Sequence, residues 1–184
     1  MSDRDFEQVG PARRAWQGDV IAVDEVTFRY TQDGTEAERE IVRHPGAVAT
    51  VPVDDEHVWL VVQPRQAVGE PDMLEIPAGK LDVDGESPEE NAQRELAEEV
   101  GKRAARLEHL KSFFTSCGVM DEEIHIYLAS GLTDAQADGE EDERIEVVAW
   151  PLDRLDEAIA RSTDSKTLIG LLLLKERLAA GWRP

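Results

Sequence analysis

The segment GKLDVDGESPEENAQRELAEEVGK, from Gly79 to Lys102, constrains the fold of this chain more than any other. Ser87 followed by Pro88 and Glu90 predicts a helix start, because the serine oxygen can accept from the third helical amide while Glu90 reaches back, and proline suits the first turn. The helix is expected to end near Gly101. Apolar residues recur along it at four-residue spacing: Ala92, Leu96 and Val100. This stripe predicts burial of one helix face against a sheet.

The same helix carries three carboxylates on one face. Glu95, Glu98 and Glu99 stand at positions i, i+3 and i+4, which are neighbours on an α-helix. Their mutual repulsion costs free energy unless a cation offsets it, and Arg94 alone cannot balance three acids. Mg²⁺, or Mn²⁺ in its place, bound between carboxylates and a substrate phosphate is one solution. A solvated acidic helix face is the alternative, since charge runs on surface helices are common.

A longer pattern surrounds these acids. Its residues are Gly79, Glu86, Arg94-Glu95-Leu96, Glu98-Glu99 and Gly101. Together they resemble the signature box of the Nudix hydrolases, in which a glycine, a glutamate and an REUxEExG core (U being aliphatic) form a loop, a helix and a loop. Two features differ: the gap from Gly79 to Glu86 is one residue longer, and Lys102 stands where an aliphatic residue is expected. The extra residue falls in the loop before the helix, where length is best tolerated.

The resemblance implies roles for the residues of the box. The metal ligands would be Glu95, Glu98, Glu99 and the carbonyl of Ala78, with Glu98 also counted among the catalytic residues. Gly79, Glu86 and Arg94 are assigned to support. Arg94 would orient the helix glutamates through a salt bridge, and for Glu86 a role as a more distant metal ligand stays open.

The order of the expected elements is mixed strands, the acid-bearing helix, more strands and two terminal helices. This order predicts an α/β fold, a Nudix-type α/β/α sandwich with a mixed sheet, preceded by an N-terminal β extension. We expect residues 1–40 to form the extension and residues 41–184 the hydrolase domain. Such an extension is typical of the ADP-ribose pyrophosphatase branch, which these residues resemble. In that branch it helps to build a homodimer and contributes to the partner's nucleotide site.

Composition limits the partners. The net charge of −20 disfavours binding to nucleic acid or to an anionic membrane, and it means that an anionic substrate needs local cations. Cys117 is the only cysteine, so no intrachain disulfide can form and a reducing cytoplasm is favoured. The polar, acidic N-terminus does not resemble a signal peptide, and the apolar run Leu168–Leu174 is too short to span a bilayer.

Alternation and turn signals place the remaining elements. Residues 1–18 are expected to be a loosely ordered lead-in. We expect strands at Val20–Tyr30, Glu40–Val53, His57–Gln63, Arg106–Thr115, Glu123–Ser130 and Arg144–Trp150. His57–Gln63 is apolar on both faces and should be central. Helices are expected at Pro151–Arg161 and Asp164–Ala180. Four leucines of the second helix are assigned to the core: Leu168, Leu171, Leu172 and Leu178.

Two residues before the box are assigned to substrate binding because they match positions of the resembled branch. Arg65 is the predicted cation for a phosphate, since a guanidinium suits bidentate contact with oxyanions. Its alternative is a surface pair with Glu70. Glu75 opens the run that leads through Pro77 and Ala78 into the box.

Two further substrate residues lie outside that run. Phe28 would stack on a base, although aromatic residues on strands are more often core residues. Gly118 matches a glycine that follows a proline in ADP-ribose hydrolases, but here Cys117 precedes it. A buried or half-buried thiol is favoured over a nucleophilic role for Cys117. Pro64 also departs from the branch, where a tyrosine is expected.

The acidic loop Asp138–Glu143 is most simply a solvated run of charge. In the resembled family a glutamate of this loop activates water or binds a further metal ion, and Glu141 or Glu143 holds the matching position. The implied reaction is hydrolysis of a nucleoside diphosphate-linked small molecule, with ADP-ribose giving AMP and ribose 5-phosphate. Two alternatives remain: a Nudix hydrolase for another nucleotide sugar or dinucleoside compound, and a catalytically silent Nudix ligand sensor.

Overall fold

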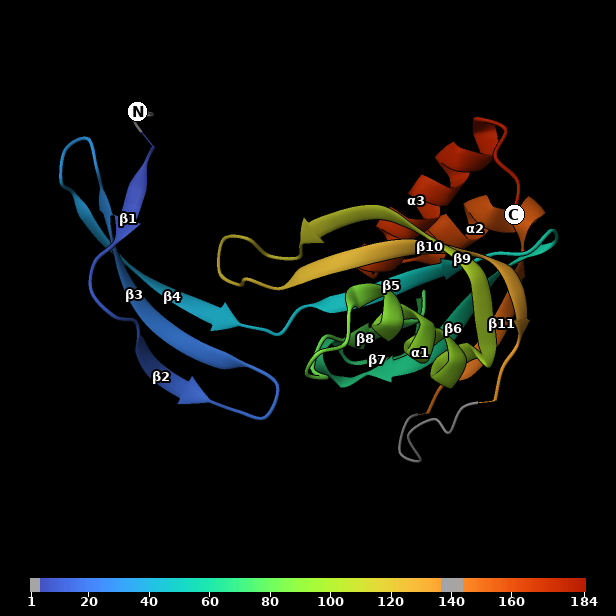
Figure 1. The fold of residues 1–184 in the computed structure, drawn as a ribbon, viewed down its shortest axis with the longest axis horizontal. Helices are drawn as coiled ribbons and strands as arrows, with labels where there is room; N and C mark the ends of the chain where they lie inside the picture. The colour runs from blue at the N-terminus through green and yellow to red at the C-terminus, as the bar shows by residue number, and fades with distance from the viewer. Residues whose placement is uncertain (1–3, 137–143) are drawn as a thin grey trace. The chain divides into compact units, whose positions relative to one another are not determined.

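The computed structural model describes residues 4–136 and 144–184 and divides into two compact units. The first comprises Met1–Gly46 and Phe114–Glu123, and the second comprises Ala47–Phe113 and Ile124–Pro184. Figure 1 labels the elements of both. A functional boundary at residue 40 stays a prediction.

The first unit is built on one long central strand. Its strands are β1 (Phe6–Gln8), β2 (Arg13–Gln17), β3 (Ala22–Tyr30) and β4 (Glu36–Arg43). β3 pairs antiparallel with all three of the others, with β4 on one edge and with β1 and β2 in succession on the other (Figure 1). The expectation of a loose lead-in was therefore wrong from Phe6 onward. Ion pairs hold β2 to β3, with Arg13 on Glu25 and Arg14 on Asp24.

Across the residues that the structure describes, the second unit contains two sheets and three helices. One sheet has the order β8 (Ala78–Lys80), β5 (Ala47–Pro52), β10 (Glu123–Asp134) and β9 (Lys102–Phe114). The other has the order β11 (Glu146–Pro151), β6 (His57–Arg65) and β7 (Glu70–Glu75), so β6 is central as expected. The helices are α1 (Pro88–Val100), α2 (Leu155–Arg161) and α3 (Ser165–Ala179), with 3₁₀ turns at Gln66–Val68 and Leu152–Arg154.

Alternating side chains along β5 create three layers. Ala49 packs with Leu171 of α3, whereas Val48 points to the opposite face and packs with Ala92 of α1. The core thus lies on both faces of the sheet, with α1 on one and α2 and α3 on the other (Figure 1). Because β5 pairs parallel with β10 and antiparallel with β8, the sheet is mixed. The predicted α/β/α sandwich with an N-terminal β extension is confirmed.

Two local expectations were wrong. The strand expected at Glu40–Val53 is two strands, since β4 ends at Arg43 and β5 begins at Ala47. Pro45 lacks an amide to donate, and Gly46 has a φ of 88°, so neither continues a ladder. Leu172, assigned to the core, is 47% exposed because it lies on the outer face of α3.

In the described ranges, residues 4–136 and 144–184, no helix is long and apolar enough to cross a bilayer.

Candidate active site

Helix α1 begins and ends where its sequence predicts. Ser87 Oγ accepts from the amide of Glu90 at 3.3 Å, while the Glu90 carboxylate accepts from the amide of Ser87 at 2.9 Å. This reciprocal capping fixes the first turn. At the other end Gly101 adopts a φ of 68°, the left-handed conformation that stops a helix. The cap residues therefore set the register of every side chain between them.

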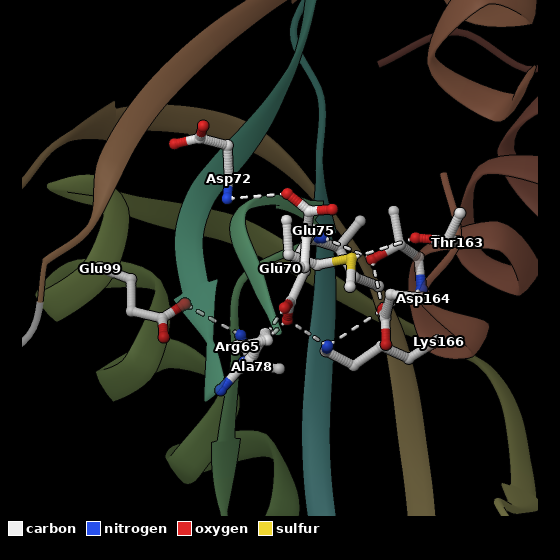
Figure 2. Close-up of polar contacts among 12 residues, drawn as sticks. Arg65, Glu70, Asp72, Glu75, Ala78, Glu99, Thr163, Asp164 and Lys166 are labelled. Atoms are coloured by element: carbon white, nitrogen blue, oxygen red, sulfur yellow. Dashed lines mark hydrogen bonds and ion pairs between the residues drawn. The ribbon is translucent and has the colours of Figure 1, made fainter. Parts of the chain in front are cut away.

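In this register the apolar stripe of α1 is buried, and one acid, Glu99, is buried beside it. Ala92, Leu96 and Val100 are buried, and Glu99 is only 8% exposed. The Glu99 carboxylate accepts from the amide of Ala78 at 3.0 Å, as Figure 2 shows. A buried carboxylate needs such a donor, because burial otherwise disfavours its charge. The contact ties α1 to β8 at the residue whose carbonyl is a predicted metal ligand.

Gly79 makes room for a second acid. A Cβ built on Gly79 would overlap Cγ, Cδ and Oε1 of Glu95. No positive φ explains this glycine, since it is absent from the positions with left-handed backbone. Its lack of a side chain is therefore what lets the Glu95 carboxylate lie directly against β8.

Arg94 connects the helix acids to the loop before the helix. Its nitrogens contact both oxygens of Glu86 at 3.1 Å, Glu95 at 2.7 Å and Glu98 at 2.9 Å. The hydrogen bonds to Glu86, with the charges of Glu95 and Glu98, raise the pKa of Arg94. In return, the hydrogen bond from Arg94 lowers the pKa of Glu86. Arg94 thus forms the salt bridges expected of it, and Glu86 contacts it from the loop.

The donor set suits a hard divalent cation. Glu95, Glu98 and Glu99 supply carboxylate oxygens, and Glu95 and Glu99 lie next to β8. Arg94 engages two of the three. Within the part of the chain that the structure describes, no three His, Cys, Asp or Glu side chains converge closely enough to hold a metal ion. Glu95 and Glu98 are instead held by the guanidinium of Arg94 in this structure.

Sequence reasoning missed Asn91, which supports the same loop. Its buried amide nitrogen donates to the carbonyl of Lys80 at 2.9 Å and to Glu86 at 2.8 Å, while its Oδ1 is buried without a hydrogen-bond partner in the described structure. Asn91 thereby closes the loop with the extra residue onto the first turn of α1. The available signal was an asparagine next to the apolar stripe, because a buried side-chain amide needs hydrogen-bond partners.

A second charged cluster lies beside the acids, on β6, β7 and α3 (Figure 2). The Arg65 side chain forms no ion pair with Glu70 in the described structure. It donates from Nε and Nη2 to the two oxygens of Glu75 at 2.6 and 2.7 Å, and Glu75 also contacts Lys166. The hydrogen bond to Glu75 raises the pKa of Arg65, and the charges of Asp164 and Glu99 act in the same direction. Lys166 was not anticipated, although a lysine in the first turn of a helix is an unfavourable position that could have marked it.

Lys102 explains one departure from the resembled box. Its ammonium lies 4.3 Å from the centre of the Trp59 ring and 2.6 Å from Asp134. The ammonium therefore makes a cation–π contact with an aromatic ring, and Asp134 pairs with its charge.

The two remaining substrate candidates of the described chain lie in the first unit. Phe28 and Gly118 line the same pocket of about 310 Å³, together with Tyr30, Arg39 and Arg43. Cys117 also lines it, and the expectation of a buried or half-buried thiol was wrong, because Cys117 is exposed. Phe28 also packs edge-on against Phe6, with ring centres 5.4 Å apart. The pocket thus combines aromatic faces with guanidinium groups. Glu141 and Glu143, the candidates for the base, lie outside the described residues.

Comparison with known proteins agrees with this architecture. The family model described as NUDIX domain matches residues 43–169. A Bacillus subtilis (strain 168) protein named ADP-ribose pyrophosphatase is 42% identical over 154 residues, which cover 80% of this chain and 83% of the relative. A Bacillus methanolicus protein named methanol dehydrogenase activator is 40% identical over 159 residues, 84% of either chain.

A solved structure supports the same assignment over the full length. The crystal structure of an ADP compounds hydrolase superposes with a TM-score of 0.85 at 25% identity, covering 100% of both chains. Fold, family model and sequence identity therefore agree, and this chain belongs to the NUDIX domain family.

Proposed function

We propose that this Nudix hydrolase cleaves the diphosphate of ADP-ribose, giving AMP and ribose 5-phosphate, with Mg²⁺ as its cofactor and Mn²⁺ as a possible substitute. The observation that carries the proposal is the acidic face of α1, which lies against Ala78 and Gly79 of β8. Similarity to a protein named ADP-ribose pyrophosphatase supports the choice of substrate.

Glu95, Glu98, Glu99 and the carbonyl of Ala78 would hold the metal ion. Their fit rests on the donor chemistry and on the space at Gly79, which only a residue without Cβ leaves for Glu95. A bound divalent ion supplies neutralisation of the diphosphate charge and a lower pKa for water. Before a metal ion binds, Arg94 would hold Glu95 and Glu98 in place, since it contacts both in this structure.

Arg65 would bind an oxygen of the diphosphate, with Glu75 holding the guanidinium in place. Glu75 is only 1% exposed and both its oxygens are engaged, so it acts on the substrate through Arg65. This cation is needed locally because the chain as a whole carries a charge of −20.

In the reaction a water oxygen attacks one phosphorus while the bond to the bridging oxygen breaks, and the bridging oxygen leaves with the other phosphate. The water's proton passes to a carboxylate acting as general base, for which Glu141 and Glu143 are the proposed groups, while Glu98 is proposed as a catalytic residue through its place among the metal ligands. Two of them, Glu141 and Glu143, lie in the acidic loop outside the described residues.

The N-terminal residues 1–40 would serve as a dimerisation element, with 41–184 as the hydrolase domain. Phe28 and Gly118 are proposed to contact the base of the nucleotide, a role that the aromatic pocket around them supports. Light scattering on the purified protein tests the homodimer.

The cytoplasm is the proposed location, because an exposed lone thiol at Cys117 suits a reducing compartment.

Cys117 and Pro64 favour a second candidate, hydrolysis of another nucleotide sugar or of a dinucleoside compound, because both depart from the ADP-ribose pattern. A catalytically silent sensor is the third. One panel separates them: the protein with Mg²⁺ is given ADP-ribose, ADP-glucose, NADH, diadenosine compounds and oxidised dGTP, and release of AMP or phosphate is measured. Turnover of none would eliminate both enzyme functions.

Glu99→Gln tests the metal assignment. We expect the rate to fall by at least about a hundredfold, the scale for loss of a metal ligand or its support. Glu89→Gln is the matched control, because Glu89 is an exposed acid of the same helix outside the acidic face. A near-normal rate for Glu99→Gln would show that the wrong face of α1 had been chosen.

A further inference from the structure

Glu75 is a buried carboxylate shared by two cations. Arg65 donates to both of its oxygens, and the ammonium of Lys166 contacts Oε2 (Figure 2). Burying a carboxylate is costly unless its charge and its lone pairs are all matched, which explains why one acid takes two partners. The position of the Glu75 carboxylate therefore depends on α3 as well as on β6.

Lys166 stands where a helix does not favour it. It occupies the first turn of α3, where the positive end of the helix dipole repels an ammonium. The cost is offset by Glu75 and by Asp164, whose Oδ2 lies 3.0 Å from the ammonium. A local rule broken in a buried cluster beside an active site is a sign that the group serves the site.

The start of α3 is also tied by hydrogen bonds to the residue that follows β7. Asp164 caps the helix by accepting from the amide and the hydroxyl of Thr167 at 2.9 and 2.6 Å. The Thr167 hydroxyl in turn accepts from the amide of Ile76 at 2.9 Å. Ile76 is the residue after Glu75, so the helix start and the carboxylate are held in one register.

Arg65 is the exposed end of this cluster. Two of its three guanidinium nitrogens, Nε and Nη2, donate to Glu75, and its side chain remains 43% exposed. Nη1 is therefore the nitrogen left for a ligand. The charge of Glu99 acts on the guanidinium, which indicates that the proposed metal site is within electrostatic range.

We infer that Lys166 is a positioning residue: it holds the Glu75 carboxylate in the orientation that presents Nη1 of Arg65 to a diphosphate oxygen. The inference rests on the function proposed above. Arg65, Glu75, Lys166 and Asp164 alternate in sign and sum to zero charge. Without the ammonium, two carboxylates compete for one guanidinium, and Arg65 is drawn away from the substrate.

Lys166→Met tests this role, because methionine keeps the length of the side chain and removes its charge. We expect the KM for ADP-ribose to rise about tenfold, equivalent to about 1.4 kcal/mol, while kcat changes less than about threefold because the interaction is made with bound substrate as well. Lys175→Met is the matched control: it removes a lysine–aspartate pair from the same helix, at a side chain that is 53% exposed. Its KM should stay within about twofold of the wild-type value, as for an exposed ion pair.

A second variant separates positioning from simple charge balance. Asp164→Asn combined with Lys166→Met restores zero net charge in the cluster and keeps a good helix cap, so the melting temperature should recover. Positioning predicts that the KM stays raised in this double variant. A KM that recovers together with the melting temperature, or that never rises in Lys166→Met, overturns the inference.

A readout without substrate distinguishes this failure from failure of the proposed function. The Nε–H of Arg65, assigned in nitrogen-15 spectra by its loss in Arg65→Lys, should exchange with water at least about tenfold faster in Lys166→Met than in wild type, as its hydrogen bond to Glu75 opens more often. It should be unchanged in Lys175→Met. If wild type cleaves no substrate but this pattern holds, only the proposed function fails; equal exchange in all proteins overturns the positioning role.

Discussion

Gly79→Ala is a small change that should move one carboxylate and little else. The new methyl group would overlap the end of the Glu95 side chain, and no other residue is among its three nearest contacts. The nearest Glu95 atom would lie 1.9 Å from the new Cβ, so it must shift by at least about 1.5 Å to reach ordinary van der Waals contact. Because Glu95 is flexible, the side chain can turn away while β8 keeps its pairing with β5.

The expected change in stability is small. Forcing Glu95 into a poorer rotamer costs about 0.5–1.5 kcal/mol. Replacing glycine by alanine restricts the unfolded chain and stabilises by about 0.4–1 kcal/mol where the backbone allows it. The two nearly cancel, so the free energy of unfolding should stay within about 1 kcal/mol of wild type. Activity should nevertheless fall about 10- to 100-fold, because a predicted metal ligand is displaced.

The assay is a double-mutant cycle with Glu95→Ala, which removes every Glu95 atom that the methyl group would overlap. Initial rates with ADP-ribose are measured across a Mg²⁺ titration, beside urea unfolding of each variant. We expect Gly79→Ala to have no further effect in the Glu95→Ala background. An equal loss in both backgrounds would refute the argument, since Gly79 would then act through something other than Glu95.

Two further predictions concern stability. Asn91→Ala should lower the free energy of unfolding by about 1–3 kcal/mol in urea titrations, because the Lys80 carbonyl loses a buried donor; an unchanged midpoint would contradict the role of Asn91 in closing the loop. The pKa of Asp164 lies below its usual 3.8: burial raises it, but the charge of Lys166 and the hydrogen bonds from Thr167 outweigh burial. Its stabilising contribution is therefore complete above pH 3.8 and is lost as the pH falls through the lower folded pKa. The difference in urea midpoint between wild type and Asp164→Asn should accordingly shrink on going from about pH 5 to about pH 2.5, and a constant difference would contradict this.

The sequence was most informative where local chemistry decides the structure. Ser87, Glu90 and Gly101 determine where α1 begins and ends through contacts within a few residues, so the spacing of the acids followed directly. The same holds for the cap of α3 at Asp164. The boundaries of these helices, and the neighbouring positions of Glu95, Glu98 and Glu99 on α1, could thus be predicted.

Long-range partners could not be predicted in this way. Lys166 meets Glu75 across 91 positions of sequence, and no local pattern identifies that pair. Glu70, the alternative partner of Arg65, does lie opposite it in the register of β6 and β7, yet the guanidinium reaches along the sheet to the buried Glu75 instead. The strands β1 and β2 were missed because they are exposed and lack an apolar alternation, and pairing with β3 alone makes them strands.

The separation between Glu75 and Lys166 has a consequence for synthesis on the ribosome. The acidic helix and β7 emerge early, but the ammonium that completes the Glu75 cluster is made only with the last helix of the chain. A nascent chain that lacks α3 therefore holds a buried acid without its second cation, and Val51 and Ile76 lose the helix that covers them at Gly170. A truncation that removes α3 consequently takes away a partner of Glu75 that lies far from α1 in sequence.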